Sequence, residues 1–335
     1  MNKFPSKRIC LTPTRNEKWI IGPFVTAAKQ WADRVVVVDQ GSTDGTLEEL
    51  QSKPDVDVVI NESVEFDEHH RQELLLSAAR ETSEKRILFA LDADEVFSAN
   101  FRESQDWDKI EAAEPGTVLR FRWVNILPGF REAWVPKEPI TLGFVDDGSP
   151  NMATGRIHNP RLPHPENAPI LDLKEVVVLH FQYVLWDRML HKQRWYQAWE
   201  KLHSPDKGAL EIFRTYNHMY GGWNPEEIQP VKKEWLNGYD RPDCNLRNLE
   251  CEEITLWEKE IVEMLQKHGA KKFSKIAIWD QDWQQVAAKM GIQGYFEDPR
   301  SLWERLAHRL LKRSQTRREK VWVRVLERCL RSIGW

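Results

Sequence analysis

The sequence predicts an α/β fold built on a doubly wound, mostly parallel sheet. Two observations predict it. Strand-sized apolar runs alternate with helical patterns through the first third of the 335-residue chain, and two of those runs end in acidic residues. Parallel strands need crossover helices between them, and ligands bind at the carboxyl ends of such strands.

Four strands and three helices are expected in this first third. The strands are expected at residues 8–12, 34–39, 56–60 and 86–91, and the helices at residues 16–32, 47–51 and 69–82. The second strand reads RVVVVD, and so continuous a β-branched run is typical of a strand that is buried on both faces. The turn-rich segment QGSTDGT follows it directly.

The pattern becomes less regular beyond residue 94. Residues 117–124 alternate like a strand of a mixed sheet, and residues 176–181 form another apolar run. Residues 125–170 are rich in Pro and Gly, which is typical of long active-site loops. A long helix is expected at residues 183–202, then a loop-rich stretch over 204–250, then helices at 252–268 and 279–290.

The composition excludes several classes of protein. With 41% hydrophobic and 30% charged residues, the chain can bury a large core. A net charge of −4 argues against a protein that mainly grips nucleic-acid phosphates. No apolar run reaches the length of a membrane span, and the N-terminus has no core of a signal peptide. Four scattered cysteines fit a reducing compartment, so we expect a cytoplasmic protein.

The C-terminal segment 300–335 differs in charge from the rest. It holds 11 Lys or Arg and 3 Asp or Glu, a net +8, so the whole-chain charge of −4 leaves −12 for residues 1–299. Apolar residues recur at helical spacing over 302–311 and 321–333. Basic amphipathic helices that carry Trp are typical of anionic membrane surfaces, which favours peripheral contact with the inner face of a membrane. Attraction to the acidic body of the protein is the alternative interpretation.

Acidic side chains dominate the expected strand ends. No GxGxxG follows the first strand and no GxxxxGK[ST] occurs, so dinucleotide and P-loop chemistry are poorly supported. Asp39 closes the second strand, and Asp92, Asp94 and Glu95 close the fourth. Several carboxylates can face a nucleoside diphosphate only if a divalent cation lies between them. The alternative is a purely structural turn in which Asp94 caps a helix.

Four motifs in order resemble glycosyltransferase family 2, which has the GT-A fold, a Rossmann-like doubly wound sheet. They are LTPTRNE, then VVVVDQGSTDGT, then HHRQELLLSAAR, then LFALDADE. The resemblance is strong over residues 8–97 and weak as far as about residue 200. It implies transfer of a sugar from a nucleotide-diphosphate sugar to a hydroxyl of a glycan or lipid-linked acceptor, with inversion. The net charge of −4 favours no nucleic-acid partner.

The resemblance also implies roles for individual residues. Asp39 would accept from the imide of the base, Arg71 would lie near the base or phosphates, and Asp92 would bind ribose and assist the metal. Asp94 would bind Mn²⁺ or Mg²⁺, which acts as a Lewis acid on the departing diphosphate. The residues that would line the base and ribose are Thr12, Pro13, Arg15, Asn16 and Glu17.

Two further contacts are expected downstream. The segment VLHFQYV resembles the strand-end His of the family, so His180 would be a second metal or diphosphate contact. A buried His that is satisfied by a backbone carbonyl is the alternative. Lys192, on the helix that follows, would reach a phosphate, unless it lies on a solvated helix face.

An inverting transferase needs a general base, usually a carboxylate, to deprotonate the acceptor. The loop segment offers Asp147 first and Asp146 second, in GFVDDGSP, with Glu138 and Glu166 as further candidates.

The resemblance suggests a division of the chain. Residues 1–203 would form the glycosyltransferase domain, with 1–97 binding the nucleotide sugar and 98–203 closing the acceptor and metal side. Residues 204–299 would form a loop-rich and then helical extension, followed by the basic tail 300–335.

Two other functions are left open. LFALDADEVF also fits the nucleophile signature of haloacid-dehalogenase-like phosphohydrolases, although three strand–helix units precede it here. A non-catalytic relative that binds sugars or nucleotides is the other alternative.

Overall fold

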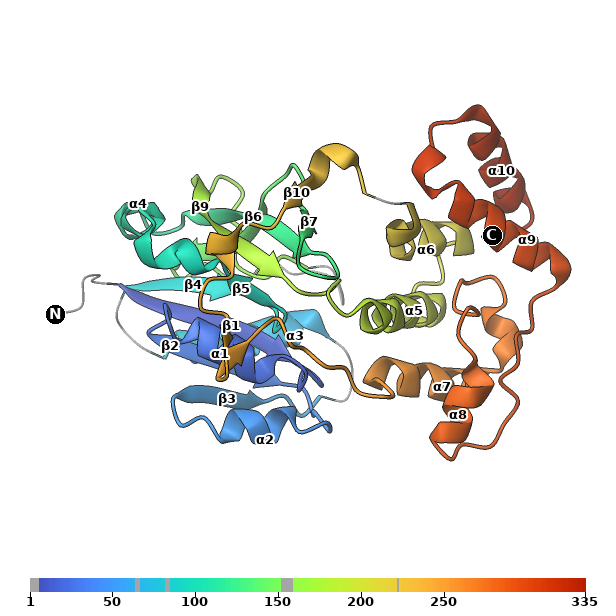
Figure 1. Ribbon diagram of the computed structural model, residues 1–335, viewed down its shortest axis with the longest axis horizontal. Helices are drawn as coiled ribbons and strands as arrows, with labels where there is room; N and C mark the ends of the chain where they lie inside the picture. The colour runs from blue at the N-terminus through green and yellow to red at the C-terminus, as the bar shows by residue number, and fades with distance from the viewer. Residues whose placement is uncertain (1–5, 64–66, 82–84, 152–158, 222) are drawn as a thin grey trace. The chain divides into compact units, whose positions relative to one another are not determined.

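The computed structural model describes residues 6–63, 67–81, 85–151, 159–221 and 223–335. The chain forms two compact units. Unit 1 comprises Met1–Leu185 and Glu226–Glu250, and unit 2 comprises Trp186–Pro225 and Cys251–Trp335. In the part of the chain that is described, the strands belong to unit 1 and unit 2 is helical (Figure 1).

Unit 1 contains the sheet and the helices that cover it. Its strands are β1 Lys7–Thr14, β2 Arg34–Asp39, β3 Val56–Ile60, β4 Arg86–Ala90, β5 Glu95–Phe97, β6 Val118–Ile126, β7 Glu132–Trp134, β8 Ile140–Val145, β9 Ile170–His180, β10 Ile228–Pro230, β11 Asp240–Arg241 and β12 Cys244–Asn245. Its helices are α1 Ile21–Ala28, α2 Thr46–Gln51, α3 Glu68–Ala79, α4 Asp106–Ala112 and the 3₁₀ helices η1 Ala99–Glu103 and η4 Lys233–Trp235.

The first four strands form a parallel block in the order β3–β2–β1–β4. The register pairs Thr14 with Asp39, and Leu11 with Ala90. The carboxyl ends of β1, β2 and β4 therefore meet at one edge, which we call the carboxyl edge. The α/β class and this parallel block are as predicted.

The remaining strands make the sheet mixed. β8 pairs antiparallel with β4 and with β6, and β7 and β10 continue antiparallel beyond β6. β9 runs parallel to β6 and antiparallel to β5. The predicted loop region 125–170 therefore contains two strands, β7 and β8. β7 has only three residues and β8 is buried along most of its length, so neither presents a long alternating pattern.

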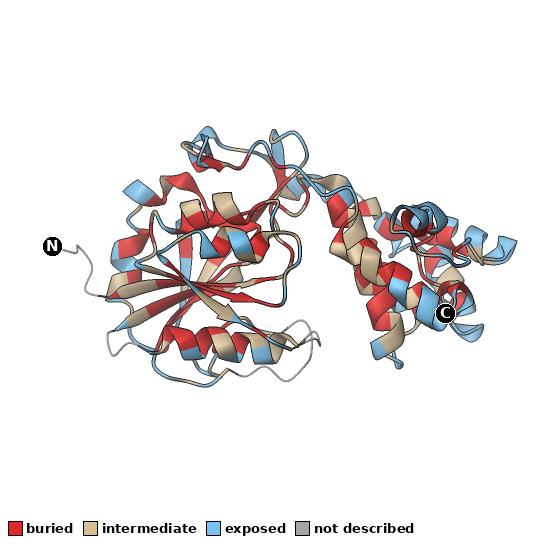
Figure 2. Cartoon of the chain, turned by 90° about the horizontal axis from the view of Figure 1, so that it is seen from below, coloured by how far each residue is buried: buried red, intermediate tan, exposed pale blue. Residues whose placement is uncertain are grey.

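Helices cover both faces of the sheet. On one face α1, α2 and α4 pack Phe24, Leu50 and Trp107 against the strands, and on the other face α3 packs Leu75 and Leu76. Figure 2 shows the strands between the helical layers coloured mostly as buried. This doubly wound arrangement is confirmed.

Helix α1 is shorter than the expected helix at residues 16–32. Asn16 has a positive φ of 56°, and the backbone N–H of Glu17 donates to Thr46 Oγ1 at 2.8 Å. Because residues 16–20 are held in a turn beside the loop that follows β2, the helix begins only at Ile21.

Unit 2 includes the C-terminal segment. Its helices are α5 Trp186–His203, α6 Ala209–Tyr216, α7 Leu256–His268, α8 Trp283–Lys289, α9 Leu302–Arg313, α10 Val321–Ser332 and the 3₁₀ helices η2 His218–Gly221, η5 Ala270–Phe273 and η6 Gln315–Arg317, with η3 Pro225–Glu227 at the junction. Buried Arg214 of α6 donates to Ser314 Oγ at 2.9 Å and to the Leu311 carbonyl at 3.1 Å, so the segment is built into this unit. None of the helices in the described residues is long and apolar enough to cross a bilayer.

Candidate functional site

The carboxylate of Asp39 organises the loop that follows β2. It is fully buried and accepts from Thr14 Oγ1 at 3.1 Å, from the Ser42 N–H at 3.0 Å and from Ser42 Oγ at 2.5 Å. A carboxylate can accept about four hydrogen bonds, so these three leave room for one further donor. Asp39 is therefore both a structural anchor and a potential acceptor.

The turn after β1 and the loop after β2 form one hydrogen-bonded unit. Asn16 donates its N–H to Ser42 Oγ at 2.9 Å, and Oδ1 of Asn16 accepts from the Thr43 N–H at 2.8 Å. Asp44 accepts from the N–H of Thr46 at 2.9 Å. These contacts hold the Arg-Asn-Glu turn and the Gly-Ser-Thr-Asp-Gly-Thr loop against each other at the carboxyl edge.

The turn after β4 carries three acids, two of which pair with Arg161. Nη2 of Arg161 lies 2.8 Å from Oδ2 of Asp92, and Nη1 donates to buried Glu95. Glu95 also accepts from Nε1 of Trp123 at 3.0 Å and from the backbone N–H of Asp92 at 2.9 Å. Burial acts to lower the pKa of Arg161, but the charges of Asp92 and Glu95 outweigh it and raise that pKa. This arginine therefore stays charged and fixes the turn.

Asp94 and His180 face each other inside the same turn. Both are nearly fully buried, and Nε2 of His180 lies 3.5 Å from Oδ2 of Asp94. Two backbone contacts bring them together: β5 pairs with β9 so that Glu95 is opposite His180, and the N–H of Phe181 donates to the Asp94 carbonyl at 2.8 Å.

The proton on His180 is placed by Asn125 of β6. The Asn125 amide donates from Nδ2 to the Trp134 carbonyl at 3.2 Å, which turns its Oδ1 toward Nδ1 of His180 at 2.7 Å. Nδ1 therefore carries a proton, and in the neutral ring Nε2 presents a lone pair toward Asp94. This is the orientation that a metal-binding His requires.

Aromatic rings line this part of the site. The ring of Trp123 stacks on His180 with 4.5 Å between centroids, and Tyr183 packs edge-on against His180 at 6.2 Å. Trp134 in turn packs edge-on against Tyr183, and its Nε1 donates to Glu227 Oε2 at 3.0 Å. We call Trp123, Trp134 and Tyr183 the aromatic wall. Glu227 is a carboxylate attached to it.

The carboxyl edge brings together most of the predicted site residues in unit 1. Arg71 lies in the first turn of α3, which follows parallel strand β3 and so begins at this edge. The N–H of Asn159 donates to Glu68 Oε2 at 3.1 Å, so the segment leading to Arg161 passes this helix end. The residues at this edge are Thr12, Pro13, Arg15, Asn16, Glu17, Asp39, Arg71, Asp92, Asp94 and His180.

The structure does not bring Asp146 and Asp147 to this edge, which corrects their expected role as general base. The N–H of Asp146 donates to the carbonyl of Arg86, the first residue of β4, so both acids lie at the opposite edge of the sheet. Buried Asp146 accepts from Arg80 at 2.7 Å and from Arg86 at 2.9 Å. Burial acts to raise the pKa of Asp146, but these hydrogen bonds hold it below its ordinary value. Asp146 is a structural ion-pair partner, and Asp147 is exposed beside it.

Three other candidates also lie outside the Asp94 turn. Glu138 is exposed. The hydrogen bond to Asp172 raises the pKa of Arg120, and the charge of Glu138 adds a smaller contribution in the same direction. Glu166 is exposed just before β9, whose first residues pair with the start of β6. Lys192 belongs to α5 of unit 2, where its Nζ lies 5.8 Å from the centroid of the Trp257 ring. Its contact with phosphate stays a prediction.

The donor set at Asp94 fits a divalent ion that is completed by other ligands. Among the described residues no group of three or more His, Cys, Asp or Glu side chains is arranged to hold a metal. Mg²⁺ is usually held by one or two carboxylates, with waters and substrate phosphates supplying the rest. Two protein ligands on one ion stand about 3.0–3.5 Å apart at ordinary metal–ligand distances of about 2.1 Å, which matches the 3.5 Å between Asp94 and His180.

Comparison with known proteins gives limited overlap. No family model matches the chain, and no curated protein matches it in sequence. Glucosyl-3-phosphoglycerate synthase from Mycobacterium tuberculosis, solved with Mn²⁺, uridine diphosphate and phosphoglyceric acid, is 19% identical over 35% of this chain and 43% of that chain, with a TM-score of 0.28. The chain thus spans less than half of the length of that synthase.

Two other solved structures show a similar level of likeness. A nucleotidyl transferase from Methanothermobacter thermautotroptrophicus is 16% identical over 41% of this chain and 70% of that chain, with a TM-score of 0.26. HddC from Yersinia pseudotuberculosis is 7% identical over 52% of this chain and 93% of that chain, with a TM-score of 0.31. Likeness at this level carries no information about reaction or substrate.

Proposed function

We propose that the chain is a metal-dependent glycosyltransferase of the GT-A type, similar to family 2, that uses a nucleotide-diphosphate sugar. The observation that carries the proposal is the buried Asp94–His180 pair at the carboxyl edge. A separation of 3.5 Å is too long for a charge-assisted hydrogen bond, which is about 2.7–2.9 Å, and suits two ligands of one cation. The four ordered motifs around this edge support the same function.

Asp94 and His180 would hold Mn²⁺ or Mg²⁺, and Asp92 would lie beside the ion. When bound, the ion supplies positive charge that stabilises the departing nucleoside diphosphate. Asn125 keeps the Nε2 lone pair of His180 aimed at the site, and Arg161 fixes the Asp92 carboxylate for the ribose hydroxyls. The protein would therefore supply part of the metal coordination in advance, and the phosphates of the donor would supply the remaining ligands.

The loops beside the pair would bind the rest of the donor. Asp39 has room for one donor, which suits the imide N–H of a uracil-type base, and Arg71 lies in the first turn of α3, whose N-terminal dipole favours phosphate. The residues that would line the base and ribose are Thr12, Pro13, Arg15, Asn16 and Glu17. Residues 1–97 would thus act as the nucleotide-sugar half, with the rest of unit 1 closing the metal and acceptor side.

We propose Glu227 as the general base, in place of the acids at the opposite edge. It is partly buried, and Trp134 holds it by a hydrogen bond at the end of the aromatic wall that begins at His180. Tyr183 is buried, whereas Trp123 and Trp134 are partly exposed, so an acceptor that contacts Trp134 would present a hydroxyl toward Glu227. That geometry would support inversion on a glycan or lipid-linked acceptor.

We also propose that the C-terminal segment touches an anionic membrane surface while the body remains in the cytoplasm. Seven large apolar side chains of this segment are exposed although their neighbours on the same helices are buried. They are Leu302, Trp303, Leu306, Val321, Trp322, Val325 and Ile333. Together with the net +8 of residues 300–335, such exposure supports binding to anionic lipid headgroups.

One assay tests the proposed reaction. The protein is incubated with a panel of nucleotide sugars and Mn²⁺, and release of nucleoside diphosphate is measured beside release of inorganic phosphate. Release of nucleoside diphosphate that stops on addition of EDTA is the expected result. Simple phosphate monoesters are tested in parallel, and release of inorganic phosphate from them would instead identify a phosphohydrolase. If neither product appears, the protein is a nucleotide-sugar-binding protein without transferase activity.

A further inference from the structure

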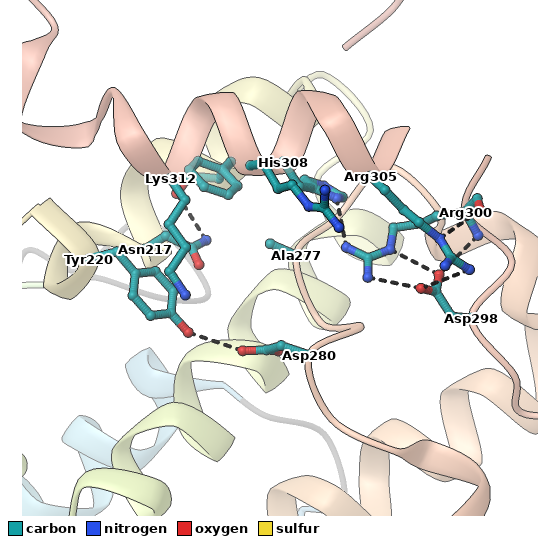
Figure 3. Close-up of a pocket in the computed structure, with 11 residues that line it drawn as sticks. Asn217, Tyr220, Ala277, Asp280, Asp298, Arg300, Arg305, His308 and Lys312 are labelled. Carbon is teal, nitrogen blue, oxygen red and sulfur yellow. Dashed lines mark hydrogen bonds and ion pairs between the residues drawn. The ribbon is translucent and has the colours of Figure 1, made fainter. Parts of the chain in front are cut away.

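Unit 2 contains a cavity of about 270 Å³ that the proposed transfer does not use. One face of helix α9 lines it, and the other lining residues come from the end of α6, from η2 and from the segments around Ala277 and Asp298 (Figure 3). At roughly 30 Å³ for each water, the volume equals about nine water molecules. The cavity is therefore large enough for a small organic anion.

Basic side chains dominate its lining. Helix α9 contributes Arg305, Arg309 and Lys312, spaced four and three residues apart and hence on one helical face. Arg300 adds a fourth cation, while Asp280 and Asp298 are the acids of the lining. A cavity with more cations than acids attracts anions.

The acids are already compensated. Asp298 pairs with Arg300 at 2.9 Å and lies 3.4 Å from Arg305. Asp280 pairs with Arg194 at 2.9 Å and accepts from the Tyr220 hydroxyl at 3.1 Å. Figure 3 shows the Tyr220–Asp280 hydrogen bond on the left of the view and the Asp298–Arg300 pair on the right.

His308 is not one of the cations. Burial lowers the pKa of His308 to about 4, and Arg300 Nη1 lies 3.1 Å from its Nδ1 while its Nε2 faces the Lys275 carbonyl at 3.1 Å. The ring is therefore neutral near pH 7 and serves to position Arg300.

Two cations are left available to a ligand. Among the residues that the structure describes, Arg309 and Lys312 have no carboxylate within ion-pair distance, and Nζ of Lys312 lies 3.5 Å from the centroid of the Tyr220 ring. The aromatic ring of Tyr220 holds the ammonium of Lys312 in place, and the N–H groups that point away from the ring can still donate to a ligand. Arg309 adds a planar fork of donors that matches phosphate oxygens.

We propose that this cavity is a binding site for a phosphate or diphosphate group, with Arg309 and Lys312 as its main ligands. The planar guanidinium and the ammonium approach the cavity from one helix face, so they can contact different oxygens of one phosphate. This inference concerns unit 2 alone and does not depend on the proposed glycosyl transfer.

Calorimetric titration of the full chain with inorganic pyrophosphate tests the proposal. The variants Arg309→Gln and Lys312→Gln are compared with Arg313→Gln, a matched control on the same helix whose side chain is exposed and does not line the cavity. Losing a charge-assisted hydrogen bond should weaken binding about tenfold or more in each cavity variant. The control should bind like the wild type.

A second arm identifies the source of the phosphate. Glycerol 1-phosphate in solution is compared with vesicles that carry the same headgroup, phosphatidic acid. Binding of the vesicles that is lost in Arg309→Gln supports a lipid headgroup, and binding of the soluble phosphates without the vesicles supports a free phosphate or diphosphate. No binding of any probe at millimolar concentration, or equal weakening in Arg313→Gln, would overturn the proposal.

Discussion

Nε2 of His180 lies 3.5 Å from Oδ2 of Asp94, and Asn125 fixes the proton of the imidazole on the other nitrogen. The pair is nearly fully buried, so it is protected from competition by solvent. Two electron-rich atoms held at this distance are stabilised by a cation that both can bind. The relationship explains why three strands, β5, β6 and β9, converge on one histidine.

Asn125→Ala should weaken Mn²⁺ binding without removing a proposed ligand. Loss of the Oδ1 acceptor frees the imidazole to rotate or change tautomer, and loss of such a supporting contact typically weakens metal binding about 10–100-fold. Electron paramagnetic resonance measures the Mn²⁺ affinity, and nitrogen chemical shifts of His180 report its tautomer. Exposed Asn248→Ala is the matched control. Unchanged Mn²⁺ affinity together with an altered tautomer would show that His180 is not a metal ligand.

Glu227→Gln should preserve nucleotide-sugar binding and lower transfer by about 10²–10⁴-fold, because the amide cannot take the acceptor proton. The neighbouring Glu226→Gln is the control, since Glu226 is exposed and pairs with Lys137 at 3.1 Å. Initial transfer rates and donor affinity are measured in parallel. Undiminished transfer in Glu227→Gln would remove this residue from the mechanism.

Asp146→Ala should destabilise unit 1 and leave the transfer rate per folded molecule unchanged. Removing the buried carboxylate leaves Arg80 and Arg86 without their shared partner, which costs about 3 kcal/mol when one member of a buried pair is lost. Urea unfolding measures the free-energy change. Exposed Asp147→Ala should change it by less than about 0.5 kcal/mol. A large loss of transfer in folded Asp146→Ala would return this acid to the catalytic site.

Unit 2 should lose stability as the pH falls from about 6.5 to about 4. In this range His308 is protonated in the unfolded chain but stays neutral in the folded one. The unfolded imidazole has a pKa of about 6.5, whereas burial lowers the folded value to about 4. Stability from this group is therefore fully present above about pH 6.5 and declines as the pH falls toward 4, by up to about 3 kcal/mol. His308→Gln, which keeps a donor and an acceptor, should flatten this decline in calorimetric unfolding. An identical pH profile for the two proteins would contradict the assignment.

Trp303→Ser combined with Trp322→Ser should reduce flotation of the full-length protein with anionic vesicles at low salt by about tenfold or more, since each exposed Trp would bury apolar area in the interface. Removing the whole segment is a poor test because buried Leu311 and the contacts of Arg214 would be lost with it. Tyr295→Ser is the control, since Tyr295 is 72% exposed outside the segment. Equal flotation of the wild type, the double variant and Tyr295→Ser would contradict membrane binding by these exposed apolar side chains.

The parallel half of the sheet and its acidic turn were predictable because their signals are local. The run Arg34–Asp39 is continuous in sequence, and Asp92 and Asp94 are separated by one residue. A buried parallel strand and a metal-binding turn both leave such short patterns. The position of His180 at a strand end was accessible for the same reason.

Other parts of the site depend on long-range pairing that no local pattern reports. Arg161 lies 69 residues from Asp92 in a segment without periodicity, and Asn125 lies 55 residues from His180. Asp146 could be placed only by knowing that β8 runs antiparallel to β4, which sends its end to the opposite edge. The acidic pair in GFVDDGSP gave no signal of the two arginines that surround it.

The most direct test of the central claim is Mn²⁺ binding to the full chain in the presence of each nucleoside diphosphate, measured by electron paramagnetic resonance for the wild type, Asp94→Asn and Asp147→Asn. The account predicts that wild type and Asp147→Asn bind Mn²⁺ with equal affinity. Asp94→Asn should bind Mn²⁺ more weakly by a factor larger than the about 10–100-fold that loss of a supporting contact causes, because Asp94 is itself a proposed ligand. Wild-type affinity in Asp94→Asn, or no Mn²⁺ binding by the wild type with any nucleoside diphosphate, would contradict it.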